Sequence, residues 1–361
     1  MPAAFWQAGT REKKVMHTRA VIVTRRGGPE VLEVREEELS DPGPGMVQVR
    51  VHACALSFAD ILIREGTYPG APVPPFTSGY DFVGFVEHVG EGVEAVKAGD
   101  LVAALTVTGA YGEYRTWPAH DLVVLPAGLD PVAASCLVLN YMTAYQMLHR
   151  TAQVKPGERI LIHGATGGVG TALLELGRMA GLRMYGTASA ERKNVVVQLG
   201  GTQIDYRTED FVTRIADLTG DGVDIVFDGI GGDVSRRSWR VLRPGGRLVL
   251  YGHYATLIRG RQDMRKVLVF YGSAASVFVR GLIPGSRQLL LYRIAKLRER
   301  HPNWFRQDLL ALADLLATGA IAPLIATTLP LVEARQAHEM LGRGGITGTI
   351  VLTCNEKAGI W

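Results

Sequence analysis

The sequence predicts an α/β protein built from a β-rich domain and a doubly wound parallel sheet. With 361 residues the chain is longer than one hydrophobic core usually grows, which favours two domains. Short alternating strands broken by Gly/Pro turns fill the chain up to about Trp117. Beyond Pro131, strand-like runs alternate with apolar helical stretches of about 10–15 residues, which is typical of right-handed βαβ units.

The composition excludes several classes of protein. Hydrophobic residues make up 47% and charged residues 20%, the balance of a globular rather than a disordered chain. The net charge of +4 is too small to indicate nucleic acid as the main partner, and no apolar run is long enough for a transmembrane helix. Three widely spaced cysteines argue against a disulfide framework and favour a reducing, cytoplasmic setting: Cys54, Cys136 and Cys354.

The elements follow in chain order. Residues 1–16 are interpreted as a flexible leader, because no apolar stretch follows their basic residues, and a start at Met1 or at Met16 stays open. Alternation of apolar and polar residues predicts strands of the β-rich domain at 47–52, 82–89 and 101–105.

In the second half, apolar runs predict strands of the parallel sheet at 159–163, 183–186, 223–228 and 247–251. A helical region is expected from about 286 to 318, and a closing strand at 348–353 is expected to rejoin the β-rich domain. Residues 267–284 are apolar enough for a further strand followed by a dimer contact.

A glycine-rich run after strand 159–163 is typical of the dinucleotide-binding loop of a Rossmann domain. Gly167 would let the backbone approach a pyrophosphate, and Gly170 would let helix and strand pack closely. The helix that follows offers free N–H groups and its dipole to the anion. The alternative is a tight strand-to-helix turn that binds nothing. The run after Gly164 consists of Ala165, Thr166, Gly167, Gly168, Val169 and Gly170.

The end of the next strand favours NADPH over NADH. An NAD site usually places Asp or Glu about 20 residues beyond the glycines to bind the ribose 2′-hydroxyl. Here Ser189, Arg192 and Lys193 follow strand 183–186, and no acid stands at the strand tip. A hydroxyl and two cations suit a 2′-phosphate, although both cations are also ordinary residues for the solvated first turn of a helix.

These motifs resemble the medium-chain dehydrogenase/reductase superfamily over residues 17–353. The glycine run, residues 57–69 and residues 139–145 carry the resemblance. Within the superfamily they are similar to the zinc-free quinone oxidoreductase and zeta-crystallin branch. The vesicle amine transport protein-like subgroup is nearest, because of Asn140, Tyr141, Thr143, Ala144 and Tyr145.

The resemblance implies a GroES-like substrate domain, an inserted Rossmann domain and a homodimer. The implied boundaries are 17–143 for the substrate domain, 144–300 for the NADP-binding domain and 301–361 for a segment that returns to the substrate domain. It also implies sites by position. Asn140 and Thr143 would lie near the nicotinamide, residues 167–169 at the pyrophosphate, and Gly252 at the end of a strand passing the nicotinamide. Around the 2′-phosphate would lie Ser189, Arg192 and Tyr206.

No metal is expected. Zinc-dependent relatives have Cys at the position of Ser57 and Gly-His-Glu at residues 79–81, whereas this chain has Ser57, Tyr80 and Asp81. The four-cysteine lobe of the structural zinc is missing as well. A catalytic zinc needs three protein ligands in a tetrahedral arrangement, and no such spacing is found among His52, His88, His120 and His163.

The expected reaction is therefore reduction of a quinone or an α,β-unsaturated carbonyl by NADPH. The oxygen that becomes negative needs hydrogen-bond donors, for which Ser57, Tyr68 and Tyr80 are the candidates. Quinone oxidoreductases commonly carry Asn at the position of Ser57, so both substrate classes stay open. Tyr68 could equally be a packed aromatic residue, and Asp60 could be an acid or a carboxylate that supports the fold.

Two further functions stay open. One is a nucleotide-binding protein with vestigial activity that interacts with lipid, RNA or another protein. The other is a biosynthetic enoyl reductase with one dedicated substrate. A basic helical run at 293–301 would suit an interaction partner, but a solvated helix face is its ordinary interpretation, so nucleic acid and membrane are not expected as main partners.

Overall fold

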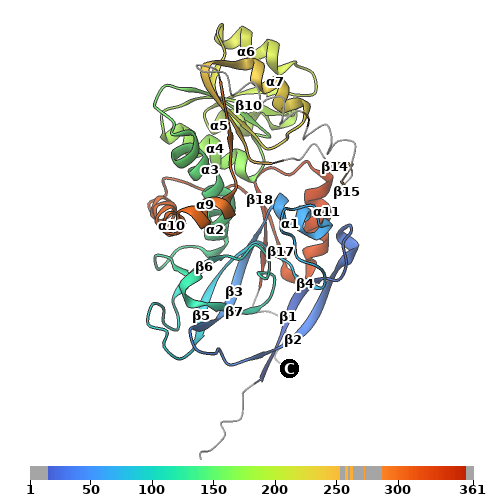
Figure 1. The fold of residues 1–361 in the computed structure, drawn as a ribbon, viewed down its shortest axis with the longest axis vertical. Coiled ribbons are helices and arrows are strands. Elements are labelled where there is room, and N and C mark those ends of the chain that lie inside the picture. The colour runs from blue at the N-terminus through green and yellow to red at the C-terminus, as the bar shows by residue number, and fades with distance from the viewer. Residues whose placement is uncertain (1–14, 253–256, 259–260, 263–271, 273–286, 355–361) are drawn as a thin grey trace, which may run out of the picture.

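The computed structural model describes residues 15–252, 257–258, 261–262, 272 and 287–354. The expected leader therefore lies almost wholly outside the described residues, and so does nearly all of the apolar segment at 267–284. Figure 1 shows two sheet-based units along the long axis, the parallel sheet above and the β-rich unit below. Within the described part of the chain, the helices are too short or too polar to cross a membrane.

The upper unit is a six-stranded parallel sheet in the order β11-β10-β9-β12-β13-β16. The order reverses between β9 and β12, and sheets of this kind bind ligands at that point, beyond the carboxyl ends of the strands. Its strands are β9 (Arg159–His163), β10 (Arg183–Ala188), β11 (Gly201–Asp205), β12 (Val223–Asp228), β13 (Leu242–Leu250) and β16 (Gln288–Leu291). Its helices are α4 (Gly168–Met179), η5 (Ala190–Arg192), α5 (Lys193–Gln198), α6 (Phe211–Thr219) and α7 (Asp233–Val241).

The start of the predicted helical region at 286–318 is wrong, because β16 occupies residues 288–291. Three successive leucines suit a short strand as well as a buried helix, and hydrophobic pattern alone does not separate the two. Pairing decides it, since Leu289 and Leu290 add to β13 in parallel register as the sixth strand. Helices follow only afterwards, as α9 (Ile294–Arg300) and α10 (Pro302–Ala317).

The lower unit combines a seven-stranded sheet with a three-stranded sheet of order β2-β1-β4. The larger sheet has the order β17-β18-β3-β5-β6-β8, with β7 beside β3. β18 pairs antiparallel with β3, which confirms that the closing strand rejoins the β-rich unit. The strands are β1 (Val15–Val23), β2 (Leu32–Ser40), β3 (Met46–Leu56), β4 (Phe76–Thr77), β5 (Asp81–Val89), β6 (Leu101–Leu105), β7 (Tyr114–Pro118), β8 (Val123–Val124), β17 (Ile325–Pro330) and β18 (Thr349–Thr353).

Short elements complete the described structure. Among them α1 follows β3 directly, and α11 precedes β18. A two-stranded ribbon lies beside the upper unit in Figure 1. These elements are η1 (Pro29–Val31), α1 (Phe58–Glu65), η2 (Ala119–Asp121), β14 (Leu257–Ile258), β15 (Arg261–Gln262), η7 (Leu331–Glu333) and α11 (Ala334–Arg343).

A continuous helical stretch at 131–152 joins the two units and crosses the expected domain boundary at 143/144. It begins where Asp130 accepts hydrogen bonds from two backbone N–H groups and Pro131 takes the first helical position. It then alternates between α- and π-helix, as α2 (Pro131–Cys136), η3 (Leu137–Tyr141), α3 (Met142–Gln146) and η4 (Met147–Ala152). π-Turns often occur at functional sites because they redirect side chains within a helix.

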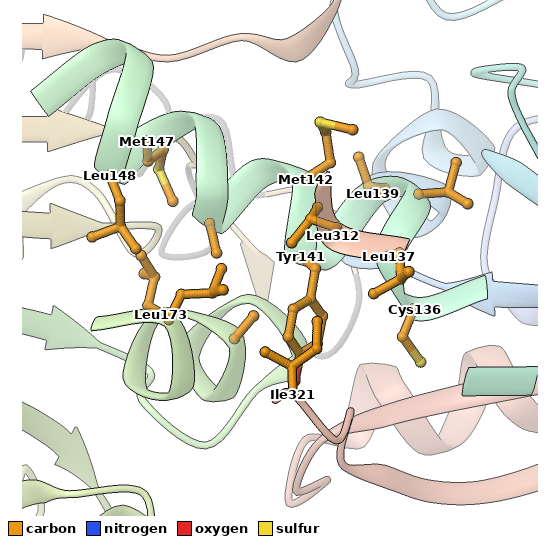
Figure 2. Close-up of a cluster of buried hydrophobic side chains, with 14 of the residues drawn as sticks. Cys136, Leu137, Leu139, Tyr141, Met142, Met147, Leu148, Leu173, Leu312 and Ile321 are labelled. Carbon is orange, nitrogen blue, oxygen red and sulfur yellow. The ribbon is translucent and has the colours of Figure 1, made fainter. Parts of the chain in front are cut away.

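This joining helix packs against both α4 and α10. Figure 2 shows Leu148 facing Leu173 of α4, and Tyr141 pointing toward Ile321. One hydrophobic cluster contains all of these residues together with Tyr80 of the lower unit. The two units therefore share a core at the joining helix, and that core lies beside the switch point of the parallel sheet.

Candidate active site

The glycine-rich loop begins at Gly164, directly after β9, and passes into α4 at Gly168. A Cβ atom on Gly170 would lie 2.2 Å from Gly164 O, so only glycine lets the helix approach the loop. A Cβ on Gly167 would meet nothing closer than Gly164 O at 3.6 Å, so the backbone is open at this residue. A loop that is open at Gly167, at a helix N-terminus and a topological switch point, fits the pyrophosphate of a dinucleotide.

The other loop residues are packed. Ala165 is fully buried, and its N–H donates to Thr187 O at 3.0 Å. Thr166 is buried and accepts at its carbonyl a hydrogen bond of 2.8 Å from Gly348 N. Val169 is half-buried and packs against the shared core. The loop is thus held from behind, by the sheet on one side and by the residues before β18 on the other.

Asn140 and Thr349 hold the first turn of α4. Asn140 Nδ2 donates to Thr349 Oγ1 at 3.0 Å. A Cβ on Gly168 would lie 2.6 Å from that nitrogen and 2.8 Å from that oxygen, so both side chains sit directly on the loop. The π-turn η3 places Asn140 there. Sequence reasoning missed Thr349, for which only its position at the start of a returning strand was a signal.

Residues expected around a 2′-phosphate gather at the ends of two neighbouring strands. Ala188 pairs with Asp205, so Ser189 and Tyr206 each follow the end of a parallel strand. Tyr206 is 56% exposed, and Lys193 is exposed at the start of α5. A cation and an aromatic face at one sheet edge suit a phosphorylated adenosine.

Arg192 reaches from this edge toward the segment before β18. Its Nη2 lies 3.3 Å from the position of a Cβ on Gly345. Arg207, which sequence reasoning missed, lies 5.9 Å from the Tyr206 ring centroid and forms a 3.1 Å ion pair with Glu191. Glu191 therefore places an acid near this edge, and that acid is paired with a cation.

Gly252 lies just beyond β13, which ends at Leu250. A Cβ on Gly252 would lie 2.6 Å from Gly229 O, and Gly229 follows the neighbouring strand β12. The chain therefore leaves no room for a side chain at residue 252, where it passes the end of β12. This close approach lies beyond the carboxyl ends of β12 and β13, on the ligand-binding edge of the sheet.

In the lower unit, Ser57 and Asp60 form a capping pair at the start of α1. Asp60 Oδ2 accepts hydrogen bonds from Ser57 N at 2.8 Å and from Ser57 Oγ at 2.6 Å. Burial raises the pKa of Asp60 to about 6, and these hydrogen bonds oppose the shift. While Asp60 is ionised, the Ser57 proton points at the carboxylate, so Ser57 presents only acceptor lone pairs to its other neighbours.

Tyr68 and Tyr80 form a hydroxyl pair. Their oxygens are 2.7 Å apart and their rings meet edge to face, with centroids 5.9 Å apart. Tyr80 is only 1% exposed, whereas Tyr68 is half-buried. Burial first, and then the charge of Tyr68, raise the pKa of Tyr80, so its hydroxyl stays protonated. The hydrogen bond between the two hydroxyls uses one of their two protons, so the other proton can be donated to a third group.

Asp81 lies next to this pair on β5. It is fully buried, and its Oδ1 accepts a hydrogen bond from Ala55 N at 3.2 Å. Burial and the nearby Asp60 raise the pKa of Asp81 well above its usual value. The described residues contain no group of three or more His, Cys, Asp or Glu side chains arranged to hold a metal ion.

Comparisons with known proteins place these features in a family. The zinc-binding dehydrogenase family model matches residues 199–352, and the model of the alcohol dehydrogenase GroES-like domain matches residues 43–127. A synaptic vesicle membrane protein VAT-1 homolog from Danio rerio is 32% identical over 346 residues, covering 95% of this chain and 71% of the relative. A 2-haloacrylate reductase from a Burkholderia species is 34% identical over 341 residues, 92% of this chain and 98% of the relative.

A solved structure agrees in fold. Escherichia coli quinone oxidoreductase complexed with NADPH has a TM-score of 0.80 and 29% identity, over 93% of this chain and 99% of that chain. The chain therefore belongs to the medium-chain dehydrogenase/reductase superfamily, in the zinc-free branch of the quinone oxidoreductases and VAT-1 homologues.

Proposed function

We propose that this enzyme delivers a hydride from NADPH to a quinone or an α,β-unsaturated carbonyl, and that the Tyr68–Tyr80 pair binds the oxygen that becomes negative. The chain is an oxidoreductase of its family, and NADPH is its cofactor, as in the Escherichia coli enzyme. The observation that carries the finer proposal is the 2.7 Å contact between the two tyrosine hydroxyls.

The hydrogen-bond directions support this division of roles. Of the three candidate donors, Ser57 gives its proton to Asp60 and so offers none to a substrate near neutral pH. Tyr80 is buried and meets its hydrogen-bonding need within the pair. When Tyr80 donates to Tyr68 Oη, the proton of the half-buried Tyr68 is free to point outward.

NADPH, when bound, supplies the hydride, and the protein supplies orientation and charge stabilisation. The backbone of residues 167–169, which is open at Gly167, and the N-terminus of α4 would hold the pyrophosphate. Arg192, Lys193 and Tyr206 would surround the 2′-phosphate, together with Ser189. Tyr68 would then stabilise the developing oxyanion and give it a proton. The half-buried Tyr68 would regain that proton from solvent, while Tyr80 stays protonated and donates to the Tyr68 oxygen.

Assembly and location complete the proposal. A cytoplasmic enzyme is supported by Cys54, Cys136 and Cys354, all of which are free thiols. The homodimer and the domain limits at 17–143, 144–300 and 301–361 rest on the family resemblance. The helical stretch across residue 143 packs on both units and so connects the two domains.

The test is NADPH oxidation by purified, chelator-treated protein with a panel of quinones and enones, and with NADH in parallel. We expect turnover with NADPH, little with NADH, and no loss after chelation. Tyr68→Phe should lower kcat about 100-fold, since it removes one oxyanion donor. The dissociation constant for NADPH should stay unchanged, because the ring and its packing remain.

Three outcomes would contradict the proposal. Tight NADPH binding without turnover of any acceptor would favour a dedicated substrate or the interaction role. Failure to bind either nucleotide would overturn the assignment of the glycine loop. Unchanged kcat in Tyr68→Phe, alongside an unchanged control Tyr185→Phe on β10, would remove the tyrosine pair from the chemistry.

A further inference from the structure

A buried histidine lies at the base of the glycine-rich loop. His163 is the last residue of β9, is 3% exposed and directly precedes Gly164. Side chains alternate between the two faces of a strand. Leu161 belongs to the cluster formed with α6 and α7, whereas Ile162 belongs to the core on the α4 side. The imidazole therefore lies on the face of the sheet that α6 and α7 cover, opposite to α4.

Both ring nitrogens of His163 have a partner. Nε2 lies 2.8 Å from Ser238 Oγ of α7, and Nδ1 lies 3.3 Å from Thr187 Oγ1 of β10. The ring also meets Phe211 of α6 edge to face, with centroids 4.8 Å apart. Ser238 is fully buried, and Thr187 is 5% exposed. Three different elements thus fix the position of the imidazole.

Thr187 extends this support to the loop. Gly164 N donates to Thr187 Oγ1 at 3.2 Å, and Thr187 stands beside His163 in the register of the parallel strands. Gly164 O in turn accepts a hydrogen bond of 3.1 Å from Gly167 N. Both polar backbone groups of Gly164 are therefore used. One fixes the start of the loop to β10, and the other holds Gly167, where the backbone is open.

The hydrogen bonds run in one direction through the ring. Burial lowers the pKa of His163, Arg237 lowers it further and Asp228 opposes the shift, so the ring is neutral near pH 7. A neutral imidazole has one nitrogen that accepts and one that donates. The Thr187 hydroxyl already accepts from the loop, so donating its own proton to Nδ1 uses both of its roles. Nε2 then carries the ring proton and donates to Ser238.

We propose that His163 is the positioning residue of the glycine-rich loop and orients the Thr187 hydroxyl for its contact with Gly164. Gly164 in turn fixes Gly167, whose backbone would hold the pyrophosphate. The inference rests on the proposed function, because it takes this loop to be the pyrophosphate site. Without an acceptor on the ring, the Thr187 hydroxyl would rotate, and its lone pairs would no longer be aimed at the loop. Backbone N–H groups that are fixed before the ligand arrives bind an anion more tightly, because less ordering remains to be done.

The test compares two ligands by calorimetry. NADPH contains the pyrophosphate, whereas adenosine 2′-monophosphate contains only the adenosine and the 2′-phosphate, so the second ligand does not reach the loop. In Thr187→Val the strand keeps a β-branched residue, but Gly164 loses its acceptor. We expect this variant to bind NADPH about tenfold more weakly, the effect of one lost hydrogen bond, and to bind adenosine 2′-monophosphate as before.

A matched control comes from β1. Thr18 is a strand threonine that is 3% exposed, and its hydroxyl has no hydrogen-bond partner among the residues that the structure describes. Thr18→Val therefore makes the same chemical change at a buried strand position outside the network. It should leave both dissociation constants unchanged.

Two further variants test the ring itself. An asparagine places its side-chain oxygen near the position of Nδ1, and a glutamine places its polar end near the position of Nε2. His163→Asn should therefore keep an acceptor for Thr187 and bind NADPH nearly as the unaltered protein does. His163→Gln can still reach Ser238 but offers Thr187 no acceptor, so it should bind NADPH about tenfold more weakly.

Each other outcome overturns one part. Weaker binding of both ligands in Thr187→Val would make the hydroxyl a support of the sheet rather than of the loop. Unchanged NADPH affinity in that variant would remove the network from the cofactor site, even if the His163 variants fail to fold. Equal affinity in His163→Asn and His163→Gln would mean that the ring acts by its shape and not as an acceptor. If the unaltered protein binds NADPH no more tightly than adenosine 2′-monophosphate, the loop does not hold the pyrophosphate, and the proposed function fails as well.

Discussion

The two sides of the candidate site are assembled in opposite ways. On the substrate side the interacting side chains are neighbours in sequence, with Ser57 and Asp60 three residues apart and Tyr68 and Tyr80 twelve apart. On the side of the joining helix Gln146 meets Tyr292 across 146 residues and Asp308 across 162. Local pairs keep their geometry through one helix cap and one loop, whereas the distant contacts exist only once both units are folded together.

The largest effect should come from breaking a distant contact. Glu175 of α4 is buried, accepts the Tyr141 hydroxyl at 2.5 Å and accepts Ala322 N at 2.9 Å. Glu175→Ala leaves both donors unpaired, which should lower the free energy of unfolding by about 3 kcal/mol in denaturant titration. The control Glu339→Ala removes an exposed carboxylate from α11 and should cost less than about 0.5 kcal/mol. If the two variants lose the same free energy of unfolding, the buried long-range contacts of Glu175 do not contribute more to stability than an ion pair at the surface.

A smaller effect is expected where the two units touch the glycine loop. In Gly168→Ala the new methyl group would lie 2.6 Å from Asn140 Nδ2, so the loop or Asn140 must shift. NADPH affinity should fall about tenfold with little change in Tm, because the displaced atoms are side-chain ends. The matched change Gly43→Ala has open space around it and should leave both quantities as they are. If the dissociation constant for NADPH is unaltered in Gly168→Ala, the Asn140–Thr349 contact plays no part in cofactor binding.

The smallest effect concerns the Ser57–Asp60 pair and depends on pH. The folded protein raises the pKa of Asp60 to about 6, so its protonated form is favoured by folding. This contribution to stability is complete below the unfolded value of about 4 and is lost as the pH rises through about 6. Below that point Asp60 donates to Ser57 Oγ and frees the Ser57 proton, which should raise kcat/KM a few-fold.

Asp60→Asn checks this directly. The variant should lose both the change in Tm between about pH 5 and pH 7 and the matching step in kcat/KM, because the amide does not titrate. Asp81, Tyr80 and Arg64 surround the same carboxyl and remain in place in the variant. The same pH profile in both proteins would assign the step to one of these neighbours.

The sequence predicted what depends on local pattern. The strands at 101–105, 159–163 and 223–228 have the observed limits. The Ser57-x-x-Asp60 spacing is also that of a capping box, a signal that could have shown in advance that Ser57 gives away its proton. The glycine loop was recognisable because strand, turn and helix follow one another within a few residues.

The other features of the site depend on contacts between residues that are far apart in the sequence, and no short stretch of sequence indicates such contacts. Tyr292 follows three leucines that suit either a helix or a strand, and nothing nearby indicates that Gln146 is its partner. Thr349 and Glu175 are single polar residues in apolar elements, with no motif around them. The π-turns at 137–141 and 147–152 are likewise not marked by any local motif.

The hydrogen bond from Gly348 to Thr166 has a consequence for how the enzyme is made. The glycine loop leaves the ribosome long before residues 348 and 349, which complete its support. A nascent chain can pair β9 with β10 early, since domains fold from the N-terminal side as they emerge, but its loop then lacks the brace from β18. Tight NADPH binding should therefore begin only once β18 has been added. Binding of the cofactor by a growing chain then shows that β18 has already paired with β3.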